Sequence, residues 1–214
     1  ISLVILQFCF LDNSNSQTNN SKYYQKDNGI LSLMYHRFNE NKYPSTNVRM
    51  EIVKEQMRII EDLGYEFYDP KNLVEEYDNP KVNKKILITI DDGFKSFYEE
   101  AWPFLKEKKI PFILFVSTEP VGRNGYMTWE EIKEIDKSKF GYIGHHSHTH
   151  EYLINFSNED FVNDIEISTK IFKDKLGYKP PIFSYPFGEY SLYMKKYISK
   201  NFDLGFGQHS GIID

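Results

Sequence analysis

Residues 86–94, Ile-Leu-Ile-Thr-Ile-Asp-Asp-Gly-Phe, put two adjacent carboxylates directly after a run of apolar and β-branched residues. Such a run is typical of a buried strand, and the Asp-Asp-Gly marks its carboxyl end. Charge beside a dry core is costly, so at least one of Asp91 and Asp92 needs a metal ion or hydrogen-bond donors to stay ionised. The alternative is a solvated turn that caps the next helix, and this stretch alone leaves both interpretations open.

Short apolar runs recur along the chain and alternate with helical patterns. We predict seven strands, at residues 30–35, 65–68, 86–90, 111–116, 141–144, 182–185 and 203–206. Helices are predicted up to Gly64, up to Gly177, and from the capping-box spacing of residues 128–131, with a looser form of the box at 157–160. The alternation predicts an α/β fold with a largely parallel sheet.

Composition narrows the class of protein further. The 214 residues, 40% of them hydrophobic, fit one domain with a sizeable core. A net charge of −5, with 22 Lys but only four Arg, argues against a nucleic-acid partner. We also expect the protein to be a monomer. The one cysteine, Cys9, excludes a disulfide framework and a cysteine-based zinc site, so any metal must be held by His, Asp or Glu.

The first 27 residues differ in character from the rest of the chain. Residues 1–11 form an apolar run that is too short to span a bilayer but suits the remnant of an export signal or anchor whose start is missing, with a buried strand or helix as the alternative. Residues 12–27 are polar and of low complexity, which predicts a flexible linker. We therefore expect a folded domain at 28–214 in a protein that is exported to the extracellular space, the periplasm or the cell envelope.

Four of the six histidines fall within residues 145–150, His-His-Ser-His-Thr-His, directly after another predicted strand. Imidazole is a common ligand of divalent metals, and one ion can be held by His146 with His150, by His145 with His148, or by His146 with His148. Two histidines and one carboxylate leave coordination positions open, as in catalytic sites. A histidine-rich surface loop with adventitious metal affinity is the alternative.

A third element, residues 183–190, Phe-Ser-Tyr-Pro-Phe-Gly-Glu-Tyr, also ends a predicted strand and turns sharply. The ordered set of Thr-x-Asp-Asp-Gly at 89–93, His-Ser-x-x-His at 146–150 and Pro-Phe-Gly at 186–188 resembles the polysaccharide deacetylases of the NodB type, carbohydrate esterase family 4. Leu-Met-Tyr-His-Arg at 33–37 extends the resemblance. It implies a distorted, TIM-barrel-like (β/α)7 barrel. A complete barrel and one that lacks its last strand both stay open, because the family's late Leu-x-His motif is not found.

The resemblance also implies roles for particular residues. Asp91 is expected to be the general base, and Asp92, His146 and His150 the ligands of a divalent metal, usually zinc, with cobalt, nickel and manganese as alternatives. His145 and His148 are then not ligands. A backbone N–H within residues 185–187 is expected to help stabilise the oxyanion.

Other assignments rest on the same resemblance. The family's acid is a late histidine, and His209 is the late histidine of this chain, with a structural or substrate-contacting role as the alternative. Ser184 stands where many members that act on chitin or peptidoglycan have an Arg that pairs with the base. Substrate contacts are expected from four residues: His36, Tyr185, Pro186 and Phe187. For His36 a buried, hydrogen-bonded histidine is the alternative.

The implied activity is metal-dependent removal of N-acetyl groups from an N-acetylhexosamine polysaccharide, such as poly-N-acetylglucosamine, a chitin-like polymer or the peptidoglycan glycan. The Phe-Ser-Tyr-Pro-Phe-Gly form of residues 183–188 is most similar to the branch that acts on poly-N-acetylglucosamine. Three alternatives stay open: an O-acetyl xylan esterase, an amidohydrolase of small molecules, and an inactive carbohydrate-binding relic.

Overall fold

The computed structural model describes residues 29–77, 82–208 and 212–213. The predicted export segment with Cys9, the predicted linker at 12–27 and the predicted acid His209 lie outside the described residues. Within the described part, none of the helices combines the length and the apolar character that crossing a membrane requires.

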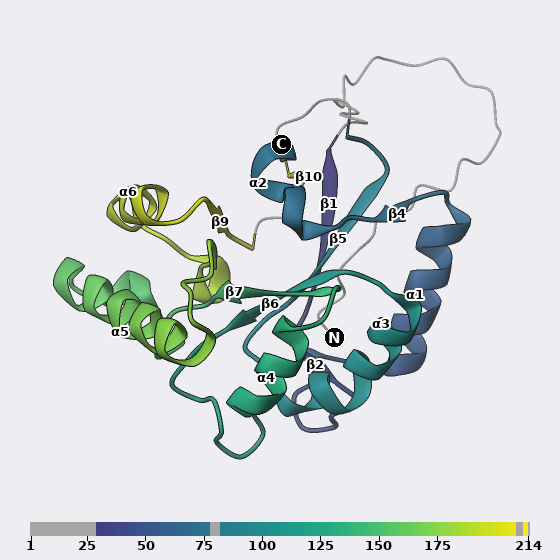
Figure 1. Cartoon of the computed structure of the whole chain (residues 1–214), viewed down its shortest axis with the longest axis horizontal. Helices are drawn as coiled ribbons and strands as arrows, with labels where there is room; N and C mark the ends of the chain where they lie inside the picture. The colour runs from purple at the N-terminus through teal and green to yellow at the C-terminus, as the bar shows by residue number, and fades with distance from the viewer. Residues whose placement is uncertain (1–28, 78–81, 209–211, 214) are drawn as a thin grey trace, which may run out of the picture.

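A curled, eight-stranded sheet forms the centre of the described chain (Figure 1). Its strands follow the order β10-β1-β5-β6-β7-β8-β9, and β4 also pairs with β5. The bounds are β1 (Ile30–Tyr35), β4 (Glu66–Phe67), β5 (Lys85–Ile90), β6 (Phe112–Val116), β7 (Gly141–His145), β8 (Ile182–Ser184), β9 (Leu204–Phe206) and β10 (Ile212–Ile213). Every pair in this sheet is parallel except β10 with β1. Because β9 and β10, the two ends of this order, do not pair with each other in the described part, the sheet is an open, distorted barrel.

All seven predicted strands are present, and none of their ends differs by more than one residue. Strands β5 and β6 are continuous apolar runs rather than alternating ones, because both of their faces are buried. The sequence did not predict a separate two-stranded sheet of β2 (Arg37–Phe38) and β3 (Asn47–Val48), since two residues are too few to give a periodic signal.

The predicted helices are confirmed together with their boundary signals. Helix α1 (Met50–Asp62) ends just before Gly64, and α5 (Asn158–Leu176) ends at Gly177, where both glycines have a positive φ. The capping box of Thr128 and Glu131 opens α4 (Trp129–Asp136). The other helices are η1 (Pro70–Asn72), α2 (Leu73–Glu76), the π-helical η2 (Phe97–Ala101), α3 (Trp102–Lys108), η3 (Leu153–Asn155), η4 (Pro186–Gly188) and α6 (Leu192–Asn201).

The helices lie around the outside of the sheet, with α1 and α3 on one side and α5 and α6 together on the other (Figure 1). One apolar core packs β5 and β6 against α1, α3 and α4, and a second packs β8 against α5 and α6. The parallel register brings the carboxyl ends of the strands to one edge. Tyr35 pairs with Ile90 and Val116 pairs with His145, so the residues that follow them begin the loops of that edge.

Candidate functional site

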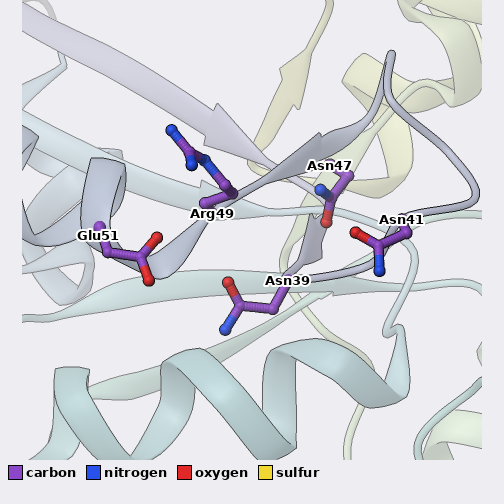
Figure 2. A pocket seen from close by; sticks show the side chains of 5 residues that line it. All are labelled: Asn39, Asn41, Asn47, Arg49 and Glu51. Carbon is purple, nitrogen blue, oxygen red and sulfur yellow. The ribbon is translucent and has the colours of Figure 1, made fainter.

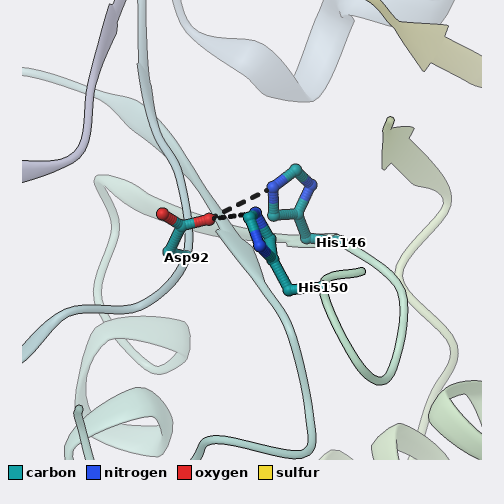
Figure 3. Close-up of side chains that lie close together, drawn as sticks. All are labelled: Asp92, His146 and His150. Atoms are coloured by element: carbon teal, nitrogen blue, oxygen red, sulfur yellow. Dashed lines mark ion pairs between the residues drawn. The ribbon is translucent and has the colours of Figure 1, made fainter. Parts of the chain in front are cut away.

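Asp92, His146 and His150 converge at the carboxyl edge of the sheet (Figure 3). Oδ1 of Asp92 lies 2.8 Å from Nε2 of His150 and 3.3 Å from Nε2 of His146. One ligand atom from each residue lies within 4.8 Å of the others, and Asp92 and His146 are buried. Two imidazole nitrogens and one carboxylate oxygen suit a divalent transition metal such as zinc and leave positions for water and substrate.

The hydrogen bonds of His146 show that this group fits a cation. Nδ1 of His146 lies 2.8 Å from the carbonyl oxygen of Ser184, which can only accept, so Nδ1 carries a proton and Nε2 is the nitrogen that faces Asp92. When the ring is neutral, the lone pair of Nε2 points at that carboxylate. Oδ1 of Asp92 is buried and accepts no well-formed hydrogen bond. Two facing acceptors repel each other unless a cation lies between them, so the three side chains fit a bound metal ion.

Asp164 of α5 fixes the loop that carries the two histidine ligands. This buried carboxylate accepts hydrogen bonds from the N–H of His148 at 2.8 Å, from the N–H of Thr149 at 3.0 Å and from the Thr149 hydroxyl at 2.8 Å. The sequence analysis missed Asp164, although a carboxylate between Phe161 and Ile165 on an apolar helix face was a visible signal. Its three donors make Asp164 a positioning residue for residues 146–150, the candidate metal-binding loop.

The backbone of this loop is unusual at two residues. Ser147 has a φ of 67° and His150 a φ of 57°, which is the left-handed region that non-glycine residues rarely adopt. The N–H of His150 donates to the Ser147 hydroxyl at 3.1 Å, and the Ser168 hydroxyl donates to the Ser147 carbonyl at 2.9 Å. Backbone strain persists only where surrounding contacts enforce it, so these bonds hold His150 aimed at Asp92.

Asp91 lies beside this group without joining it. Its side chain is almost fully buried, and its Oδ2 has no hydrogen-bond partner. Burial raises the pKa of Asp91, while the nearby charges of His146 and His36 oppose that rise. The pKa of Asp92 moves the other way, because its contacts with His146 and His150 outweigh the effect of burial. The pKa values of the two adjacent carboxyls thus shift in opposite directions, and Asp91 keeps an oxygen without a hydrogen-bond partner that can take a proton.

His36 lies at the same edge as Asp91. It directly follows β1 as Asp91 follows β5, and the N–H of Asp91 donates to the carbonyl of Tyr35 at 2.9 Å. The charge of His36 is close enough to lower the pKa of Asp91. The side chain is half-buried. His36 therefore lies at the same edge of the sheet as Asp91, and a substrate contact from it stays a prediction.

The turn at residues 183–190 exposes fewer side chains to a substrate than the sequence predicts. Tyr185 and Pro186 are buried, and the Tyr185 ring packs against Phe183, so their burial corrects the expectation that these two side chains contact a sugar. Only Phe187 is exposed among the three. The N–H of Tyr185 donates to the carbonyl of Phe206, and proline has no N–H. Among residues 185–187, the N–H of Phe187 is therefore the remaining candidate for the oxyanion donor that the resemblance predicts.

The two remaining histidines of the cluster have other partners. His145 is buried among the rings of Phe172, Phe183 and Phe202, and burial lowers its pKa to about 3. Nδ1 of His148 lies 2.8 Å from the hydroxyl of Thr118. Of the histidine pairs that spacing alone left open, the structure therefore brings His146 and His150 together.

A separate polar pocket of about 330 Å³ lies near the start of α1 (Figure 2). Its lining consists of Asn39, Asn41, Asn47, Arg49 and Glu51. The amide oxygens of Asn39 and Asn47 accept hydrogen bonds from the backbone N–H groups of Met50 and Glu40, so these amides fix the loop between β2 and β3. The pocket shares no residue with the Asp92, His146 and His150 group.

Known proteins share this sequence pattern. The profile of the family described as polysaccharide deacetylase matches residues 78–204. YxkH of Bacillus subtilis (strain 168), which is named for that family, is 28% identical over 161 residues, or 74% of this chain and 57% of YxkH. The poly-beta-1,6-N-acetyl-D-glucosamine N-deacetylase of Escherichia coli (strain K12) is 22% identical over 171 residues, or 71% of this chain. The chain spans just over half the length of YxkH and a quarter of that of the Escherichia coli protein.

Solved structures share the fold. IcaB from Ammonifex degensii superposes with a TM-score of 0.79 at 27% identity, over 87% of this chain and 86% of IcaB. The deacetylase PplD of Streptococcus pyogenes superposes with a TM-score of 0.77 at 23% identity, over 86% of this chain and 85% of PplD. The segment that the family profile matches covers more than half of the chain. It contains the two aspartates, the two paired histidines and the Pro-Phe-Gly turn. This chain therefore belongs to the polysaccharide deacetylase family.

Proposed function

We propose that this chain is a metal-dependent hydrolase that removes N-acetyl groups from an N-acetylhexosamine polysaccharide. The observation that carries the proposal is the buried, unpartnered Oδ2 of Asp91 beside the Asp92, His146 and His150 group. A general base beside a metal site is what metal-assisted amide hydrolysis requires, and the carboxyl edge of a parallel sheet is where such sites lie. Family membership and the relative named as a poly-beta-1,6-N-acetyl-D-glucosamine N-deacetylase support the choice of substrate.

The side chains divide the chemistry among them. A divalent metal held by Asp92, His146 and His150, zinc in this proposal, supplies polarisation of the acetyl carbonyl and a more acidic water. Oδ2 of Asp91 accepts the proton of the attacking water, and burial strengthens it as a base. The N–H of Phe187 donates to the carbonyl oxygen as negative charge develops there. Acetate and a free amine are the products.

The leaving amine needs a proton, and we assign its donation to His36. The other described histidines are engaged elsewhere: His146 and His150 belong to the metal group, His145 is buried and neutral, and His148 contacts Thr118. His36 is half-buried at the edge of the site, and its charge lowers the pKa of Asp91. Histidine is suited to this role because its ordinary pKa lies near neutrality. An acid role for His209 stays a prediction.

Acetate release from oligomers of N-acetylglucosamine tests the proposal. The full chain loaded with zinc is expected to release acetate from chitooligosaccharides or from poly-N-acetylglucosamine. Asp91→Asn and a chelator, used as separate controls, should each abolish the release. Absence of release from every N-acetylated polymer, with one zinc bound per chain, would overturn the proposal. Faster release from acetylxylan or from a small acetamide would instead identify one of the alternative activities.

The same proposal places the protein outside the cytoplasm, where such polymers occur. The apolar run at 1–11 and the polar stretch at 12–27 support export. Fusing the natural protein through residue 27, with any residues that precede Ile1, to a reporter enzyme that works only after export is expected to give reporter activity. An inactive fusion would contradict export by this segment.

A further inference from the structure

A row of four aromatic rings leads from the metal group to the surface. The ring of His146 lies 4.9 Å from that of His150, which lies 4.9 Å from that of Phe187. Phe187 in turn stacks on Tyr152 with ring centroids 3.8 Å apart and planes within 3° of parallel. Exposure rises along the row, from 1% for His146 to 38% for Phe187 and 46% for Tyr152. The outermost ring therefore presents one face to solvent, two rings away from a metal ligand.

The backbone holds Phe187 in this row at a cost. Phe187 has a φ of 58°, in the left-handed region that residues with a Cβ rarely adopt. Gly188 follows with a φ of 71°, and a Cβ there would lie 2.5 Å from Cβ of Gln208. Tyr185 and Pro186 are buried just before the turn. The turn thus directs the Phe187 ring outward, although an apolar ring is normally most stable in a core.

Tyr152 belongs to a different segment of the chain from Phe187, and contacts within that segment hold it in place. It directly precedes η3, whose Leu153 is buried, and the carbonyl of Tyr152 accepts a hydrogen bond from the N–H of Asn155 at 2.9 Å. It also follows the metal-binding loop by two residues, so the loop and the ring are positioned together. An exposed ring that is fixed before a ligand arrives loses little conformational entropy on binding.

We infer that the exposed face of Tyr152 is a stacking platform for a second sugar ring, next to the sugar whose acetyl group lies at the metal group. A pyranose presents an apolar C–H face that fits a flat ring, and the tyrosine hydroxyl offers a polar tip to sugar hydroxyls. Continuity of the ring row with His150 favours the substrate chain as the occupant. This inference rests on the proposed function and makes the substrate an oligomer of at least two sugars.

The experiment separates binding from hydrolysis. The affinity of metal-stripped full chain for the pentamer of N-acetylglucosamine is measured by calorimetry, which needs no turnover. Tyr152→Ala is expected to weaken it about tenfold, while Tyr152→Phe keeps it within about twofold. Tyr178→Ala is the matched control, because Tyr178 is also exposed but follows α5 at the opposite edge of the sheet, and its affinity should not change. Equal affinity of wild type and Tyr152→Ala would overturn the platform.

Kinetics give the second readout. With zinc bound, Tyr152→Ala should raise KM for the pentamer about tenfold and leave the hydrolysis of 4-nitrophenyl acetate unchanged, since that small ester reaches the metal group but not Tyr152. A matching loss on both substrates would overturn the platform and indicate damage to the site. If the wild-type chain binds the pentamer through Tyr152 but releases no acetate, the proposed function fails while the platform stands.

Discussion

The substitution Asp164→Asn should loosen the metal-binding loop without changing any metal ligand. The asparagine has nearly the same shape, but one carboxylate oxygen becomes an NH2 group that faces backbone N–H donors. At least one of the three hydrogen bonds to His148 and Thr149 is lost. Hydrogen bonds to a charged group contribute about 1.5–3 kcal/mol each, so we expect the free energy of unfolding of the metal-free protein to fall by about 2–4 kcal/mol.

Metal affinity is the more informative readout for Asp164. Partners of metal ligands are typically worth 10- to 100-fold in affinity, so the Kd for zinc should rise about 10- to 100-fold, or about 1.4–2.7 kcal/mol. The assay is competition with a chromogenic chelator. Asp174→Asn, on the exposed face of the same helix, is the matched control and should leave the Kd unchanged. A folded Asp164→Asn variant whose Kd lies within twofold of wild type would refute the reasoning.

Three further predictions follow from the same site. Asp91→Asn should reduce acetate release at least a thousandfold while one zinc still binds; loss of zinc binding would instead make Asp91 a ligand. His36→Gln should slow hydrolysis of an acetamide at least 100-fold more than that of an aryl ester, whose leaving group needs no proton, and an equal loss on both substrates would contradict its assignment as acid. The metal-free protein should lose stability as pH falls from 6.5 toward 3, because the pKa of His145 is 6.5 when unfolded and about 3 when folded, so the unfolded chain binds the extra proton. Urea unfolding should give a slope of up to about 1.4 kcal/mol per pH unit that is shallower in His145→Gln, and identical slopes would contradict the burial of a neutral ring.

Much of the fold could be predicted because its signals are local. The apolar runs gave all seven strands, and Gly64, Gly177 and the Thr128 capping box gave helix boundaries. The pairing of β2 with β3 had no such signal. The curl of the sheet also depends on which strands pair, and sequence periodicity carries no information on that pairing.

The residue types of the site and their sequence segments could be predicted, but not which side chains pair or which of them are exposed. Spacing left several histidine pairs open, because the left-handed backbone of Ser147 and His150, which turns His150 toward Asp92, is not visible in the order of residues. The burial of Tyr185 was missed because its backbone stays extended beyond the end of β8 and its N–H still donates to Phe206 of β9, before the turn reverses at Phe187. Neighbours from distant segments could not be found, and Tyr152 beside Phe187 is the clearest case.

A zinc titration that records acetate release tests the central claim most directly. Metal-stripped full chain is mixed with chitooligosaccharide, and zinc is added in steps of a fraction of an equivalent. The account predicts no release without metal, a linear rise up to one zinc per chain and a plateau beyond it, with Asp91→Asn binding the same single zinc but remaining inactive. Full release by the stripped protein, or none at one bound equivalent, would contradict a metal site formed by Asp92, His146 and His150 that works with Asp91.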